Sequence, residues 1–179
     1  MSTDFESARR KYKPGIKFLL VAEAPPREDS GRFFYFENVS TGDSLFLETM
    51  KVLYPKDYTK TKIVRQRKQE FLERFKGDGF YLIDSCDSPM EDSSPTKKRK
   101  QIQKALPSLR SKLRELATDG VKIVLISATV YEVCNDILKS EGFNIINEEL
   151  IDFPGSGGQK KFREKFGNLL KKNGWVIRA

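Results

Sequence analysis

The chain has 179 residues, a length that suits one compact domain with a single core. Its 33 lysines and arginines exceed its 25 aspartates and glutamates, and the net charge of +8 favours a polyanion such as nucleic acid over an anionic membrane surface. The sequence contains no histidine, which excludes imidazole bases and Ser-His triads, and Cys86 and Cys134 are too few for a four-cysteine metal site. We therefore expect neither a metal nor a cofactor.

Residues 1–13 are polar and are predicted to form a mobile or loosely helical arm. They lack the apolar core of a signal peptide, and no apolar run approaches the roughly 20 residues that a membrane span requires. Two lone cysteines fit a reducing compartment. We expect a cytoplasmic, monomeric protein without membrane contact.

The first predicted strand covers residues 16–22 and is apolar throughout its second half, as in a strand buried on both faces. Pro25 and Pro26 end it, because proline donates no hydrogen bond to a sheet. The loop then carries Glu28, Asp29 and the aromatic run that follows Arg32, residues 33–35. Charge, rigid backbone and aromatic surface thus meet at the carboxyl end of a strand, where open α/β sheets bind ligands.

Further apolar runs at residues 80–83, 121–126 and 143–146 predict three more strands, the last of them weaker. Segments with helical periodicity separate them, and the last helix begins near Gln159. This alternation predicts an α/β fold, a three-layer α/β/α sandwich around a parallel four-stranded sheet, with residues 1–179 forming one domain.

Polar side chains gather where the predicted strands end, at Asp84, Asp87, Ser127 and Thr129 as well as in the first loop. A glycine-rich turn at residues 155–158 precedes Gln159, Lys160 and Lys161. Its free N–H groups and the helix dipole would favour a phosphate, although an ordinary flexible loop is the alternative. Lys60, Lys62, Arg65, Arg67 and Lys68 form a basic patch, most simply a solvated helix face.

The order of these motifs resembles the uracil-DNA glycosylase superfamily over roughly residues 16–172. The sequence AEAPPREDSGRFF, residues 22–34, is similar to the GEAPGxxEDxxGxxF signature of its thermostable branch. LIDS, residues 82–85, lies where the superfamily has a strand ending in a base-reading asparagine, and VLISATVYE, residues 124–132, resembles its third strand and turn. FPGS, residues 153–156, occupies the place of its HPS motif.

The resemblance implies a role for each matching position. Glu23 would orient a water molecule, with Glu28 or Asp29 as second choices. Phe34 would stack on the base, Asp84 would recognise its edge, and Ala24 and Pro25 would adjoin it. The phosphate contacts would come from Ser127 and from the segment Gly155, Ser156, Gly157, Gly158, Gln159, Lys160 and Lys161. DNA is favoured over RNA.

Several positions depart from the superfamily pattern. Phe153 replaces the histidine that stabilises the departing base, Ala24 replaces a carboxylate, and the cluster cysteines of the thermostable branch are missing. Asp84 replaces asparagine, and an ionised carboxylate only accepts hydrogen bonds, so it favours an exocyclic amine. Three functions stay open: a DNA N-glycosylase of altered specificity with weak uracil activity, a non-catalytic nucleic-acid or base-binding module, and an enzyme acting on a free nucleotide or another small anion.

Overall fold

The computed structural model describes residues 3–177. Helices and strands alternate through most of the chain, in the order α1 (Thr3–Lys11), β1 (Phe18–Ala22), the short 3₁₀ helix η1 (Glu28–Ser30), α2 (Ser44–Leu53), α3 (Thr61–Gln66), α4 (Lys68–Gly77), β2 (Phe80–Asp84), α5 (Pro95–Leu116), β3 (Lys122–Leu125), α6 (Ala128–Ser140) and α7 (Gln159–Lys172). Within this described range, no helix is both long and apolar enough to cross a membrane.

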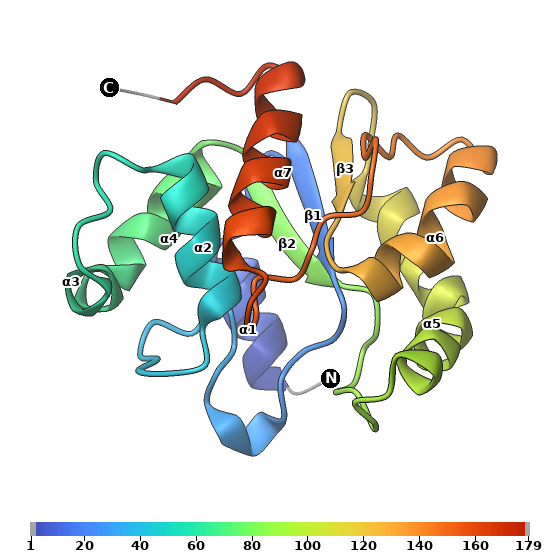
Figure 1. The fold of residues 1–179 in the computed structure, drawn as a ribbon, viewed down its shortest axis with the longest axis horizontal. Helices are drawn as coiled ribbons and strands as arrows, with labels where there is room; N and C mark the ends of the chain where they lie inside the picture. Colours follow the sequence, from blue (N-terminus) through green and yellow to red (C-terminus); the bar gives the residue numbers. More distant parts are fainter. Residues whose placement is uncertain (1–2, 178–179) are drawn as a thin grey trace.

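The three strands form one parallel sheet in the order β2-β1-β3 (Figure 1). All residues of β1 and β2 are buried. Because successive side chains of a strand point to opposite faces, this burial requires that both faces of the sheet be covered. Helices α2 and α7 pack together, as do α5 and α6, and α6 also contacts β3 (Figure 1). The α/β class and the parallel sheet predicted from the sequence are confirmed.

The predicted fourth strand is reduced to a single bridge. Ile145 pairs with Ile123 in parallel fashion, and no longer ladder forms at residues 143–146. The reason lies in Asn147, whose buried side-chain amide donates to the carbonyl of Leu125 at 3.0 Å and accepts from its N–H at 2.8 Å. A side chain thus takes the backbone groups of β3 that a longer fourth strand would pair, so the sheet has three strands rather than four.

The N-terminal segment, predicted to be a mobile or loosely helical arm, is helical and packs on the core. Residues 3–11 form helix α1, while residues 1 and 2 of the predicted arm lie outside the described range. Phe5 is buried and stacks on Phe33 with ring centroids 4.3 Å apart, and Tyr12 is fully buried. The aromatic run after Arg32 therefore anchors α1 beside the carboxyl ends of the strands. The polar composition of residues 1–13 gives little sign of this packing.

Candidate functional site

A cavity of about 230 Å³ opens at the carboxyl ends of β1 and β2. We call it the strand-end pocket. Its lining includes Glu23 and Ala24 after β1, Asp84 at the end of β2, Phe34 from the first loop and Phe153 from the turn before α7; the other lining residues are Ala22, Pro26, Arg32, Phe33, Gly42, Asp43, Ser44, Leu45, Phe46 and Leu82. Parallel pairing places Ala22 opposite Asp84. Two carboxylates therefore reach one cavity from neighbouring strand ends.

Glu23 is half-buried and held by two partners. The Thr129 hydroxyl donates to its Oε2 at 2.6 Å, and the Lys98 ammonium lies 3.1 Å from its Oε1. Thr129 is supported in turn by Ser127, whose Oγ is 3.2 Å from the Thr129 hydroxyl. A carboxylate has about four lone-pair positions, so both oxygens can accept a further hydrogen bond. Glu23 is thus oriented and still able to bind a water molecule.

The backbone at Ser127 is unusual. Its φ of 89° lies in the left-handed region, which non-glycine residues rarely adopt. Its Oγ accepts from the N–H of Val130 at 3.3 Å and caps α6, while its own N–H donates to the carbonyl of Ile151. This conformation turns the chain from β3 into α6 so that Thr129 reaches Glu23. Strained residues of this kind cluster at functional sites.

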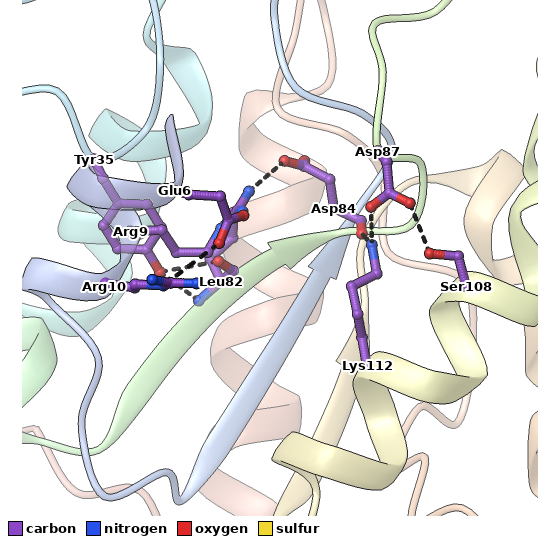
Figure 2. A network of polar contacts seen from close by, with 9 residues as sticks. All are labelled: Glu6, Arg9, Arg10, Tyr35, Leu82, Asp84, Asp87, Ser108 and Lys112. Carbon is purple, nitrogen blue, oxygen red and sulfur yellow. Dashed lines mark hydrogen bonds and ion pairs between the residues drawn. The ribbon is translucent and has the colours of Figure 1, made fainter. Parts of the chain in front are cut away.

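Asp84 is buried and paired with the N-terminal helix. Nη2 of Arg9 donates to its Oδ2 at 3.3 Å, and Nη1 of Arg9 donates to Glu6 at 2.7 Å (Figure 2). The guanidinium also lies over the Phe33 ring, 5.3 Å from its centroid. Burial raises the pKa of Asp84 to about 6, against the opposing effect of the Arg9 and Lys112 charges. This carboxyl group therefore changes its protonation close to neutral pH.

A second set of contacts holds the loop after β2. The Lys112 ammonium donates to the backbone carbonyl of Asp84 at 2.7 Å and to the Asp87 carboxylate at 3.0 Å, and Ser108 donates to Asp87 at 2.6 Å (Figure 2). Both donors come from α5. Helix α1 thus holds the side chain of the predicted site residue Asp84, and helix α5 holds its backbone. Asp87 points toward α5 and does not line the pocket.

Aromatic rings supply the apolar walls. Phe34 is 9% exposed and packs edge-on against Phe46, with ring centroids 5.6 Å apart. Phe153, by contrast, is 45% exposed although it lines the cavity. A flat ligand could therefore contact Phe34 from inside the pocket and Phe153 at its mouth. Phe34, which the resemblance predicts to stack on a base, lines the pocket. Phe153 lines it too, although the sequence marks that position only as the place of a missing histidine.

The glycine turn at residues 155–158 shapes the backbone around Phe153. A Cβ atom at Gly158 would lie 2.3 Å from the carbonyl oxygen of Phe153, and one at Gly155 would lie 3.2 Å from its ring. At Gly158 only glycine permits this close approach to the backbone. Ser156 and Gly157 are exposed at the surface, as are Lys160 and Lys161, and none of these four lines the pocket. The turn therefore serves first to present Phe153, and its predicted phosphate contacts stay a prediction.

The remaining predicted residues are not brought together. Glu28 and Asp29 lie in η1, exposed and outside the pocket lining, so the structure offers them no access to a bound base. Pro25 is buried without lining the cavity. Ser127 is 2% exposed, so its side chain is not available to a phosphate and instead caps α6. Of the three candidate carboxylates after β1, only Glu23 faces the pocket.

Sequence reasoning missed three residues that shape the site. Arg9 belongs to the segment predicted as a mobile or loosely helical arm, and its only local signal is the amphipathic pattern of the helix at residues 3–11. Thr129 is a polar residue at a strand end for which the sequence predicts no specific role. Lys68 belongs to the predicted basic patch, yet it is 1% exposed. In residues 3–177 no group of three or more acidic or sulfur ligands could hold a metal ion.

Comparison of the chain with protein-family models, with curated proteins and with solved structures finds no match.

Proposed function

We propose that this protein binds nucleic acid and holds one base in the strand-end pocket. The observation that carries the proposal is that Glu23, Phe34 and Asp84, from three separate segments, line a single cavity of about 230 Å³. Aromatic rings offer stacking surfaces to the faces of a base, and a carboxyl group can bind its polar edge. The net charge of +8 favours a polyanionic ligand.

The chemistry that this arrangement supports best is hydrolysis of the N-glycosidic bond. Glu23 accepts a proton from a water molecule whose oxygen attacks C1′ of the sugar. The bond between C1′ and the base nitrogen breaks, and its electron pair leaves with the base. Asp84 in its protonated form can supply a proton to the departing base, a task for which this histidine-free chain has no imidazole. The resemblance to uracil-DNA glycosylases supports the same assignment of Glu23.

The protonation of Asp84 determines which base edge the pocket accepts. When ionised, Asp84 only accepts hydrogen bonds and pairs with an exocyclic amine, such as that of cytosine. When protonated, it also donates and suits a carbonyl oxygen, such as those of uracil. With a pKa of about 6, both forms are populated slightly below neutral pH. Activity on uracil is therefore expected to be weak at pH 8 and to rise toward pH 6.

A binding module without chemistry is the second candidate, and two observations favour it. Both oxygens of Glu23 already have protein partners, Thr129 and Lys98. Phe153 stands where the resemblance places a histidine, and its ring cannot stabilise a departing anion. In this case the pocket would hold an unpaired or flipped base, and the chain would mark or protect that position in the nucleic acid.

An abasic-site assay separates the two candidates. Oligonucleotides containing uracil, hypoxanthine, cytosine or damaged bases are incubated with the protein and cleaved at abasic sites by alkali. For an N-glycosylase, Glu23→Gln reduces cleavage by roughly 10²–10³-fold, because the group that orients water is lost. Glu28→Gln is the matched control, because Glu28 is an exposed glutamate outside the pocket, and it should retain full activity.

Binding of the same oligonucleotides completes the test. Base-dependent binding without cleavage supports the module. Cleavage that survives Glu23→Gln contradicts the assigned mechanism. If neither wild type nor variant distinguishes an oligonucleotide with an unpaired base from a fully paired duplex, the strand-end pocket does not receive a base and the proposal fails.

A further inference from the structure

The strand-end pocket has a second end, formed by the beginning of α2 and the loop before it. Arg32 lines this end, and its side chain is exposed. It lies across Gly42, where a Cβ atom would be 2.4 Å from its Cδ and 2.6 Å from its Nη1. Gly42 also has a φ of 67°, which disfavours other residues. The loop thus seats this guanidinium beside the first turn of α2.

The first turn of α2 offers free donors to the same space. Ser44, Leu45 and Phe46 line the pocket, and the leading N–H groups of a helix have no partner within it. Asp43 stands at the N-cap but makes no side-chain cap bond. Its carboxylate instead accepts two hydrogen bonds from Arg65, at 2.7 and 3.0 Å. With the capping group turned toward Arg65, the positive end of the helix dipole is left open to a ligand.

Lys68 adds a buried positive charge behind this wall. It is 1% exposed, and among the described residues its ammonium has no hydrogen-bond partner. The ammonium lies over the ring of Phe46, 4.5 Å from the centroid, on a residue that lines the pocket. The charges of Asp43 and Glu37 attract the ammonium, and the Arg65 charge opposes them. A buried cation without a hydrogen bond is still unfavourable in the free protein, and a ligand anion would relieve it. Asp43 also lines this end, but its carboxylate is paired with Arg65 at 2.7 Å. Arg32, the α2 turn and Lys68 together therefore raise the potential at one end of the cavity.

We propose that this end of the pocket is a phosphate subsite, so that the ligand enters as a nucleotide rather than as a bare base. The inference rests on the proposed function and deepens it. Glu23 and Asp84, at the other end, repel a phosphate and attract the base edge, which fixes the orientation of the ligand. The phosphate can come from a free nucleotide or from the backbone of a strand, since both present the same anionic oxygens.

The first test needs no base. Inorganic phosphate is titrated into ¹⁵N-labelled protein at constant ionic strength, with chloride as the reference anion. The amide signals of Ser44, Leu45 and Phe46 should shift with a common dissociation constant for phosphate. Arg32→Gln should raise that constant by about tenfold or more, because hydrogen bonds between charged groups are stronger than those between neutral groups. Arg27→Gln is the matched control, because Arg27 is an exposed arginine of the same loop outside the pocket, and it should change nothing.

The second test identifies the source of the phosphate. Affinities are measured for a nucleoside, for its 3′- and 5′-monophosphates and for an oligonucleotide, with wild type and with Arg32→Gln. A monophosphate that binds at least tenfold more tightly than its nucleoside, with the gain lost in Arg32→Gln, supports a free nucleotide. The alternative is that only the oligonucleotide binds more tightly than the nucleoside, and that Arg32→Gln reduces the slope of log K against log salt by about one. This result supports a phosphate in the backbone of a nucleic-acid strand.

The outcomes distinguish the two proposals. If nucleosides bind but phosphate adds no affinity, or if phosphate shifts only the amides of the turn at residues 155–158, the subsite is refuted while the base pocket stands. If phosphate shifts the α2 amides but neither nucleoside nor oligonucleotide binds, the subsite stands and the nucleobase function is refuted. Absence of all these effects refutes both.

Discussion

Arg9 and Asp84 form a buried ion pair, at 3.3 Å, between helix α1 and the end of strand β2. Their side chains are 7% and 6% exposed, and the two residues are 75 positions apart. Through this pair the N-terminal helix holds in place a carboxylate that lines the strand-end pocket, although no residue of α1 lines the pocket itself. The Arg9 charge also partly opposes the rise of the Asp84 pKa.

Arg9→Met should destabilise the protein, because it leaves the Asp84 carboxylate buried without its partner. Removing one member of a buried ion pair costs about 3–5 kcal/mol, and the cost here should be near the lower figure because Asp84 can take up a proton. The loss should therefore be larger at pH 7.5 than at pH 5. Urea denaturation at both pH values measures it. Arg10→Met, at a side chain 78% exposed, is the matched control and should change stability by less than about 0.5 kcal/mol.

Asp84→Asn should change base preference and remove its pH dependence. The amide offers a donor and an acceptor at every pH, so the variant should keep one constant preference between uracil and cytosine from pH 5 to pH 8, whereas wild type should shift its preference between them. Fluorescence titration with base-substituted oligonucleotides measures this. A wild-type preference that is constant across that range would contradict the role of Asp84 in recognising the base edge.

Stability should respond to the same substitution. Burial raises the pKa of Asp84 from 3.8 to about 6, so the folded protein binds more protons than the unfolded chain between these values. The contribution of Asp84 to stability is thus fully present below pH 3.8 and is lost as the pH rises through about 6. The asparagine of Asp84→Asn does not titrate, so its contribution to stability does not change with pH. The stability of this variant relative to wild type should rise between pH 4 and pH 7 in denaturation curves, and a constant difference would contradict the raised pKa.

Lys68→Met should stabilise the protein at neutral pH by about 1–2 kcal/mol. The substitution removes a buried ammonium without a hydrogen bond, and the lost interaction with the Phe46 ring offsets part of the gain. Burial lowers the pKa of Lys68 from 10.5 to about 8, so between these values the unfolded chain holds a proton that the folded protein has released. Wild type therefore gains stability as the pH rises from 8 to 10.5, and the advantage of the variant should shrink there.

The same variant should bind phosphate more weakly, since the charge behind the α2 turn is gone. Thermal unfolding between pH 7 and 10 and the phosphate titration described above provide the two measurements. Lys62→Met, on the exposed face of α3, is the control for both. A less stable Lys68→Met protein at pH 7 would show that the ammonium has a stabilising partner in solution.

Phe153→His should raise any base release from uracil-containing DNA by at least about tenfold. Phe153 lines the pocket, so an imidazole there can donate to the oxygen that gains charge as the base departs. Phe153→Leu removes the ring without adding a donor and should lower base affinity instead. Single-turnover cleavage at pH 7 compares the three proteins. Equal rates for the histidine and leucine variants would place residue 153 away from the reacting base.

Much of the fold could be predicted from the sequence, because its signals are local. The unbroken apolar run at residues 18–22 marks a strand buried on both faces, and Pro25 and Pro26 mark its end, whatever packs around them. The reduction of the predicted fourth strand to a single bridge could not be foreseen, because it depends on the side chain of Asn147 reaching Leu125, 22 residues away. Tertiary contact, rather than propensity, decided that difference.

The same division applies to the site. The parallel α/β pattern by itself determined that Glu23 and Asp84 meet at one edge of the sheet, because carboxyl ends of parallel strands lie together. Only the tertiary structure decided that Glu28, Asp29 and Ser127 stay out of the pocket, that Phe153 enters it, and that Arg9 and Lys68 are buried beside it. The periodicity of helices and strands depends on residues that are close in the sequence. The partner of a charged side chain depends instead on how segments distant in the sequence pack together.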